Sequence, residues 1–160
     1  MDFEHAVAQA ASALAEPGQP ETGFRGIERA LAGLVGHRLF TLLVTTEDRQ
    51  VQRVYTSNPT AYPVGGRKAM APTPWGELVL GRREPYLGRD PAAIRWAFPD
   101  HELIASLGLG ATINWPVVYD GRVLGTMNLL DREGAYDRRQ MELCRPFAAL
   151  LVPAFGRLAA

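Results

Sequence analysis

The sequence contains a single cysteine, Cys144. One thiol excludes an internal disulfide, a Cys-x-x-Cys redox pair and a zinc site built from several thiolates. A chain without disulfides is typical of a reducing compartment, and we therefore predict a cytoplasmic location.

The sequence also lacks a net charge, a long apolar run and a basic N-terminal segment. Its 17 basic and 17 acidic residues cancel, so we expect no nucleic-acid partner and no binding to an anionic membrane. No apolar stretch is long enough for a membrane-spanning helix, and the acidic start of the chain is unlike a secretory signal. We predict a single globular domain over residues 1–160, a length that supports a proper core.

The stretch that organises the rest of the chain is 109–131. Two runs rich in β-branched and aromatic residues flank Asp120-Gly121 there. Asp-Gly between such runs is a strong hairpin signal, because both central positions of a type I′ turn need a positive φ. This turn predicts three pairs of facing residues: Tyr119 with Arg122, Val117 with Leu124, and Trp115 with Thr126.

Both faces of the predicted hairpin are largely apolar. One face would carry Ile113, Trp115, Val117, Tyr119, Leu124, Thr126 and Asn128. The other would carry Thr112, Asn114, Pro116, Val118, Val123, Met127 and Leu129. A sheet with one face in water is apolar on one side only. We therefore expect helices to cover one face, and loops or a ligand pocket to cover the other.

The residues before the hairpin divide into a helical part, a β part and a long irregular part. Apolar periodicity predicts helices over 3–15 and 21–35, and strands over 38–46 and 50–57, joined by a turn at 47–49. Alternation along the second strand places three residues on one side: Val51, Arg53 and Tyr55.

The segment 58–108 is rich in proline and glycine. We predict a loop over 58–74, and long loops inside compact domains are usually functional. Short elements follow, predicted as helices over 74–81, 91–98 and 101–107 and a strand over 84–87.

The end of the chain predicts one long helix over 138–158. Asp137 and Gln140 have the spacing of a capping box at its start. Apolar residues continue at helical spacing across Pro146 and Pro153, so we expect these prolines to bend the helix without ending it. The order of all elements favours an antiparallel sheet with helices, an α+β fold.

Residues 20–158 resemble a GAF domain. The similarity is carried by Asn114-Trp115-Pro116-Val117-Val118, by the turn and strand from Asp120 to Gly125, by Met127-Asn128-Leu129, and by 146–151. The resemblance implies a GAF/PAS-like central antiparallel sheet. Terminal helices would pack on one face, and loops and short helices, here 58–108, would roof a pocket on the other. GAF domains bind cyclic nucleotides, bilins, haem, amino acids or nothing, and some reduce free methionine sulfoxide.

Aromatic residues of the second strand and the roof are the main lead to a ligand site, because small-molecule pockets are mostly apolar with a few placed polar groups. From the strand and roof we predict Tyr55, Tyr62, Trp75, Tyr86, Trp96, Phe98 and His101. From the sheet we predict Thr112, Thr126 and Asn128. The alternative is that the aromatics simply fill the core between roof and sheet.

Catalysis and tightly bound cofactors have little support in the sequence. The sulfoxide reductases of the family need cysteines in the pocket loops, whereas Cys144 lies on the apolar stripe of the last helix, where cysteine acts as a small hydrophobe. Because the pocket loops contain no cysteine, we also expect no covalent link to a bilin. The sequence signature of the cyclic-nucleotide-binding members of the family is missing as well. No second histidine lies near His101, so we predict no metal site and name no cofactor.

Gly65-Gly66-Arg67-Lys68 has two interpretations. Consecutive backbone donors beside two cations are typical of an anion cradle, whereas glycine-rich segments are commonly plain surface loops, which is the interpretation that we favour.

The function that we predict is a sensory or regulatory module, non-catalytic, that binds an unidentified small organic molecule. It would signal through association, as a homodimer formed by the terminal helices (residues 1–18 at the start) or with a signalling partner. The alternatives are an enzyme related to free methionine-R-sulfoxide reductase and a purely structural dimerisation domain.

Overall fold

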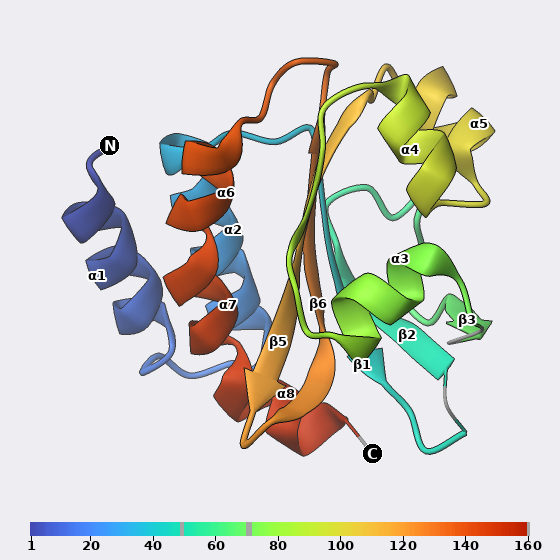
Figure 1. Ribbon diagram of the computed structural model, residues 1–160. Coiled ribbons are helices and arrows are strands. Elements are labelled where there is room, and N and C mark those ends of the chain that lie inside the picture. The colour runs from blue at the N-terminus through green and yellow to red at the C-terminus, as the bar shows by residue number, and fades with distance from the viewer. Residues whose placement is uncertain (49, 70–71, 160) are drawn as a thin grey trace.

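A computed structural model describes residues 1–48, 50–69 and 72–159. Its centre is a six-stranded, fully antiparallel sheet in the order β3-β2-β1-β6-β5-β4 (Figure 1). The strands are β1 (Leu39–Thr45), β2 (Gln50–Thr56), β3 (Arg67–Ala69), β4 (Tyr86–Gly88), β5 (Ala111–Tyr119) and β6 (Arg122–Asp131). The predicted α+β class with an antiparallel sheet is confirmed.

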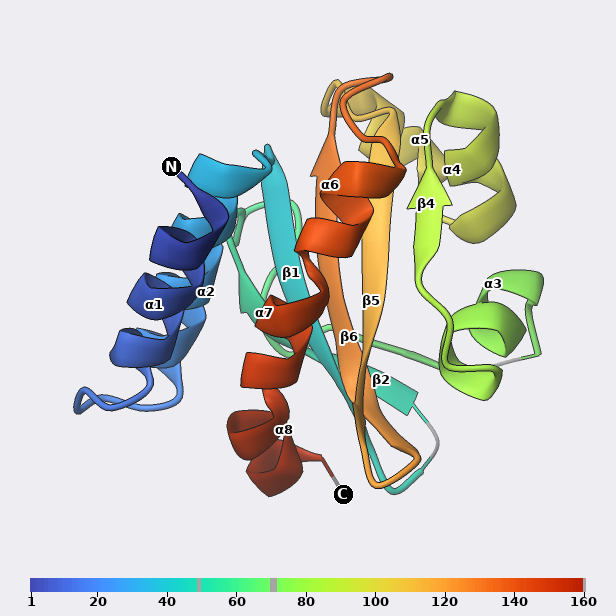
Figure 2. The same ribbon diagram turned by 60° about the vertical axis from the view of Figure 1, so that its left-hand side comes forward.

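The terminal helices form a layer on one face of the sheet (Figures 1 and 2). They are α1 (Phe3–Ala13), α2 (Glu21–Leu34), α6 (Arg138–Leu143), α7 (Arg145–Leu150) and α8 (Val152–Leu158). Helix α1 lies outside the others and packs on α2 and α7 (Figure 1). Its buried residues are the small Ala6 and Ala10, which allow close approach of the helix axes.

The segment between β2 and β5 forms a roof over the opposite face (Figure 1). Besides β3 and β4 it contains α3 (Pro74–Gly76), the π-helical turn η1 (Glu77–Gly81), α4 (Pro91–Ala97) and α5 (His101–Ser106). Thr73 and Asp90 cap α3 and α4 through their side chains, each followed by proline at the first helical position, where a missing N–H costs nothing.

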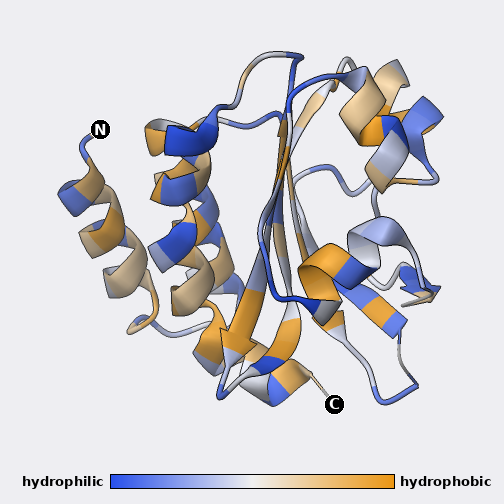
Figure 3. Cartoon of the chain, viewed as in Figure 1, coloured by the Kyte–Doolittle hydropathy of each residue, from blue (hydrophilic) through white to orange (hydrophobic). Residues whose placement is uncertain are grey.

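The central strands are buried on both faces, as the apolar composition of 109–131 predicted. All residues of β1 are buried, as are Ala111–Val117 of β5 and Leu124–Leu130 of β6. Apolar residues accordingly mark long stretches of the central strands (Figure 3).

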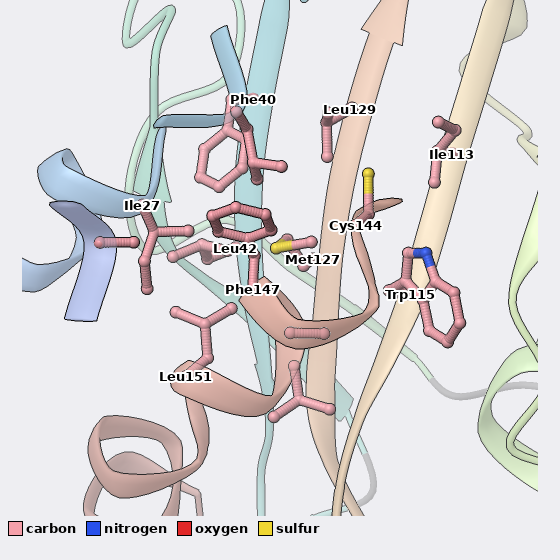
Figure 4. Packing of buried hydrophobic residues seen from close by; sticks show 14 of the residues in the cluster. Ile27, Phe40, Leu42, Ile113, Trp115, Met127, Leu129, Cys144, Phe147 and Leu151 are labelled. Carbon is pink, nitrogen blue, oxygen red and sulfur yellow. The ribbon is translucent and has the colours of Figure 1, made fainter. Parts of the chain in front are cut away.

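The helical side holds the larger hydrophobic core (Figure 4). Fully buried side chains of the sheet, among them Phe40, Leu42 and Met127, meet Phe147 and Leu151 of the last helices. A second, smaller cluster joins the roof to the other face.

The tight turn of the central hairpin is confirmed. Asp120 and Gly121 have φ of 53° and 72°, and Tyr119 pairs with Arg122. A β-bulge after Val117 then shifts the register, so that Val117 faces Gly125 and not the predicted Leu124.

This bulge makes the predicted faces of β6 wrong. A one-residue slip turns every following side chain to the opposite face. Trp115 consequently faces Met127, and Asn114 faces Asn128. Thr126 and Asn128 therefore share a face with Thr112 and Asn114, on the roof side.

A second bulge lies between β1 and β2. The register shifts between Leu42 and Leu43, with Leu42 facing Tyr55 and Leu43 facing Arg53. Since Leu42 and Leu43 are adjacent and point to opposite faces, Tyr55 turns to the helices and Arg53 to the roof. The prediction that both lie on one side is wrong for this reason.

Two further elements differ from the predictions. The predicted loop 58–74 contains β3, which pairs with β2. The predicted long helix is divided into α6, α7 and α8 at Cys144 and Leu151, because Pro146 and Pro153 each occupy the first turn of a new helix. The capping box of Asp137 with Gln140 is confirmed. Residue 49 of the predicted turn, and residues 70 and 71, lie outside the described ranges.

Replacing Gly125 should destabilise the fold. A Cβ at this position would lie 2.0 Å from the Leu43 carbonyl oxygen and 2.8 Å from the Phe155 ring. We expect Gly125→Ala to lower the free energy of unfolding by about 3 kcal/mol, the upper end for overpacked cores, measured by urea denaturation.

The matched control for this substitution is Gly156→Ala. No atom lies within 4 Å of a Cβ at Gly156, and alanine favours a helix by about 1 kcal/mol over glycine. Equal urea midpoints for the two variants would contradict the close packing of Gly125 under α8.

Candidate ligand pocket between the sheet and the roof

The roof encloses a small cavity against the sheet. Its volume is about 30 Å³, which is room for about two water-sized groups. It is lined by Leu39, Thr41, Leu43, Arg53, Tyr62, Lys68, Trp75, Phe98, Asp100, Ile104, Asn114, Asn128 and Leu130. We call this space the inner cavity.

A second, larger space adjoins the inner cavity on the roof side. This outer pocket has a volume of about 270 Å³, close to the lower end of the roughly 300–1,000 Å³ that is usual for small-molecule sites. Its lining is Val51, Lys68, Ala69, Thr73, Trp75, Gly76, Leu80, Ala97, Phe98 and Pro99. Because Lys68, Trp75 and Phe98 line both spaces, these side chains form the partition between them.

Buried amide side chains form the floor of the inner cavity. Asn114 donates to the Asn128 side-chain oxygen at 2.9 Å and accepts from the Trp75 indole N–H at 3.1 Å. The Asn128 amide nitrogen in turn donates to the backbone and side-chain oxygens of Thr41.

Two threonines complete this hydrogen-bond network. Asn114 also donates to the hydroxyl of Thr112, and Asn128 to the hydroxyl of Thr126. Each amide nitrogen and oxygen of the pair thus has a partner, and a fully satisfied buried network is rigid. The floor is therefore a fixed polar surface that also holds the roof through Trp75.

Two cations form one wall of the inner cavity. The Arg53 guanidinium lies 4.9 Å from the Tyr62 ring centre, and the Lys68 ammonium lies 5.7 Å from that of Phe98. Arg53 Nη1 donates to the Pro63 carbonyl, whereas its buried Nε has no hydrogen-bond partner. Within the described ranges no hydrogen bond or ion pair involves the Lys68 ammonium. Burial lowers the pKa of both groups.

One carboxylate faces these cations. Asp100 accepts a hydrogen bond of 2.6 Å from the Tyr62 hydroxyl. Burial, followed by this hydrogen bond, raises the pKa of Tyr62, so the phenol stays protonated. In the described part of the chain no ion pair joins Asp100 to Arg53 or Lys68, and the wall carries two positive charges against one negative charge.

Several predicted site residues meet at this pocket. Tyr62, Trp75, Phe98 and Asn128 line the inner cavity. Thr112 and Thr126 lie beside it, in the network that holds Asn114 and Asn128.

The other four predicted residues lie elsewhere. Tyr55 is on the helical face, where its hydroxyl donates to Glu28 and its ring meets Phe24 and Phe40 edge-on. Tyr86 and Trp96 stack on each other with ring centres 5.1 Å apart, and Trp96 is 48% exposed. His101 begins α5 and lines neither space. The structure does not bring these four residues to the inner cavity or the outer pocket, and a role for them in ligand binding stays a prediction.

The sequence interpretation does not identify five polar or charged residues of the pocket: Thr41, Arg53, Lys68, Asp100 and Asn114. Lys68 carries a usable signal, since it is the only lysine of the chain and belongs to the segment Gly65-Gly66-Arg67-Lys68, for which an anion cradle is one interpretation. Lys68 lies on β3, and the pairing of β3 with β2 places it in the pocket wall and not in a surface loop.

Cys144 has none of the properties of a reactive thiol. Its side chain is fully buried among the helical-side core (Figure 4), and it contacts the Gln140 carbonyl oxygen. Burial raises the pKa of Cys144 to about 12, so the thiolate nucleophile does not form near neutral pH.

The described residues contain neither a metal-ligand cluster nor a membrane-spanning helix. Within residues 1–48, 50–69 and 72–159, no three His, Cys, Asp or Glu side chains gather closely enough to hold a metal ion. None of the helices in these ranges combines the length and apolar character that a membrane-spanning segment requires.

Comparison with known proteins places these observations in a family. The sequence model of the GAF domain matches residues 21–155. No match was found among curated proteins.

Solved structures with the same fold are numerous but distant in sequence. The GAF domain of a phosphoenolpyruvate-protein phosphotransferase from Acinetobacter has a TM-score of 0.77 and 12% identity, with 96% of this chain and 92% of that chain covered. The corresponding domain from Coxiella burnetii has a TM-score of 0.75 and 17% identity, with coverage of 98% and 94%. The chromophore-binding domain of the bacteriophytochrome RpBphP3 from R. palustris has a TM-score of 0.72 and 14% identity, and the 98% of this chain that aligns spans 60% of that structure.

The floor network predicts a specific response to Asn128→Asp. The carboxylate would lose the amide donations to Thr41 and Thr126 and would place a charge in a buried site. We expect a loss of about 3 kcal/mol in unfolding free energy near neutral pH, as for a buried polar group left without partners. The loss should shrink toward pH 4, since a buried carboxyl is protonated there. Urea denaturation at several pH values measures both effects.

Asn58→Asp is the matched control. The Asn58 side chain accepts one hydrogen bond, from the Ala61 N–H, and a carboxylate retains that acceptor. A loss for Asn128→Asp no larger than for Asn58→Asp would contradict the role of the Asn128 amide as a donor.

The burial of Cys144 predicts that its thiol resists modification in the folded protein. We expect no reaction with a thiol reagent such as DTNB at about pH 8, because the thiol is buried and protonated, and full reaction after denaturation in guanidinium. Ser12→Cys, which adds a thiol at an exposed position of α1, should react at once in the native state. Rapid labelling of the folded protein that has Cys144 as its single thiol would contradict the structural role of Cys144.

Proposed function

The chain belongs to the GAF domain family, and from this premise we propose that it is a non-catalytic sensory or regulatory module that binds a small organic molecule between its sheet and its roof. GAF domains are typically small-molecule-binding sensory or regulatory modules. The observation that carries the proposal is the pair of adjoining spaces that meet at Lys68, Trp75 and Phe98. Such a site combines apolar walls with a few converging polar groups.

Ligand binding would act on the roof through Trp75. Its indole N–H is bonded to Asn114 in the rigid floor, and its ring contacts Phe98 with centres 5.8 Å apart. A ligand that enters between the two spaces must contact this partition. A ligand that prefers one position of the roof would shift the population toward it, and the roof position would be the signal.

The signal would pass to a second copy of the chain or to a partner protein through the terminal helices. Support comes from α1, which packs outside α2 and α7 (Figure 2) and leaves Met1 and Phe3 exposed at 53% and 40%. We propose a homodimer through this surface.

A purely structural dimerisation domain is the second candidate. It is favoured by one observation, the small volume of the inner cavity, about 30 Å³, since a space of this size is close to a filled core. An enzyme related to free methionine-R-sulfoxide reductase is not supported, because the described lining of the two spaces contains no thiol.

Native mass spectrometry of freshly purified protein tests the proposal. We expect a dimer that retains a small molecule, seen as a mass excess that is lost on denaturation. Leu43→Phe should abolish the mass excess, because the larger side chain fills the inner cavity that Leu43 lines. Its melting temperature, measured in parallel, shows that the variant is folded, since overpacking costs about 1–3 kcal/mol.

Val64→Phe is the matched control, because it adds a similar bulk to a residue that is 62% exposed and lines neither space. Retention of the molecule by Leu43→Phe would contradict the location of the site. A dimer without any retained molecule, which also shows no stabilisation by a library of metabolites, would favour the structural candidate.

A further inference from the structure

The charges in the pocket specify the chemistry of its ligand. We infer that this ligand is a small organic carboxylate, with its acid group in the inner cavity beside Arg53 and Lys68 and its apolar body in the outer pocket. This inference rests on the proposed function and names the class of molecule that the same site would take.

The charge around the inner cavity favours an anion. Among the residues that the structure describes, Arg53 and Lys68 face a single carboxylate, Asp100, and form no ion pair with it. The chain as a whole has no net charge, and its only lysine lies at this cavity. The local excess of one positive charge is therefore matched by a ligand with one negative charge.

These cations also have unused hydrogen-bond capacity. Arg53 Nε is buried without a partner among the described residues, and an unsatisfied buried donor is costly. The Lys68 ammonium contacts the Phe98 ring and, in the described residues, has no hydrogen bond. A carboxylate supplies the acceptors that both groups lack, since an arginine fork matches its two oxygens.

The size of the inner cavity also fits a carboxylate. The inner cavity of about 30 Å³ has room for about two water-sized groups, which is the number of oxygens in a carboxylate. A phosphate group has a tetrahedral shell of oxygens and needs more room than this cavity offers.

The outer pocket has an apolar character. Apart from Lys68 and Thr73, the described side chains that line it are apolar, among them Val51, Leu80 and Phe98. An amphipathic molecule therefore fits the two spaces in one orientation, with its acid group toward Arg53.

Among the residues that the structure describes at the inner cavity, Asp100 alone opposes a negatively charged ligand, and the two cations Arg53 and Lys68 outnumber it. One of its oxygens is engaged by the Tyr62 hydroxyl at 2.6 Å. A cationic ligand, by contrast, would have to enter beside both Arg53 and Lys68, against their repulsion.

The three tryptophans of the chain provide a site-specific readout by NMR. The indole N–H of Trp75 faces the pocket floor, that of Trp115 is bonded to the Met141 carbonyl on the helical face, and Trp96 is exposed on the roof. Titration of the ¹⁵N-labelled full chain uses benzoate and hexanoate as probes, with benzamide, hexanamide, benzylamine and phenyl phosphate for comparison. We expect at least one carboxylate to shift the Trp75 signal saturably, with Trp96 and Trp115 unchanged, and its amide to bind about tenfold or more weakly.

Arg53→Gln and Lys68→Gln should each weaken carboxylate binding about tenfold or more, since each removes a charged donor. Arg145→Gln is the matched control. The Arg145 guanidinium also lies on an aromatic ring, 4.7 Å from the Trp115 ring centre, but outside the pocket, and its loss should leave the affinity unchanged. Melting temperatures confirm that all three variants are folded.

The outcomes separate this inference from the proposed function. Equal or tighter binding of an amide or of benzylamine at Trp75 would overturn the anionic ligand and leave the small-molecule function intact. Preference for phenyl phosphate would overturn the carboxylate. The inference would be overturned if no probe shifted the Trp75 signal. It would also be overturned if neither Arg53→Gln nor Lys68→Gln changed the affinity for the carboxylate. The proposed function is tested separately, by the retained molecule in native mass spectrometry.

Discussion

The hydrogen bond between the side-chain amides of Asn114 and Asn128 connects the main parts of this structure. It crosses β5 and β6 in a sheet that is buried on both faces. An amide buried without partners would cost about 1–3 kcal/mol, so the pair also requires Thr41 on β1 and Trp75 in the roof. Three central strands and the roof are thereby held to one polar network.

This arrangement divides the molecule into a part whose packing and hydrogen bonds are complete and a part with unused hydrogen-bond donors. The helical side is packed with large apolar side chains, and the floor of the pocket has its hydrogen bonds satisfied. The wall opposite is different, because Arg53 and Lys68 lie on aromatic rings and keep unused donors. Groups that are partly desolvated and incompletely paired are the part of a fold that a ligand can stabilise.

The general architecture could be predicted from the sequence, whereas the composition of the site could not. The Asp120-Gly121 turn, the capping box at Asp137 and the apolar periods depend on local chemistry that is visible in the chain. The faces of β2 and β6 depend on two bulges, whose extra residues interrupt an otherwise regular alternation. Gly125 pairs with Val117 at the bulge in β6, and a glycine inside a strand is a bulge signal, whereas β2 contains no such residue. The period of two that predicts the faces of Tyr55 and Asn128 does not hold across these bulges.

The two bulges that make the predicted faces of β2 and β6 wrong also bring the polar residues of the pocket together. With regular alternation, Asn128 would face away from Asn114, and Arg53 would share a face with Tyr55. Each bulge turns one of these polar residues toward the roof, where Asn114, Asn128 and Arg53 line the same cavity. A local departure from the regular pattern costs ladder hydrogen bonds and is expected where function requires it. The two positions at which the sequence periodicity fails are therefore the positions at which Asn128 and Arg53 reach the cavity, which agrees with our proposal that a ligand binds on the roof side of the sheet.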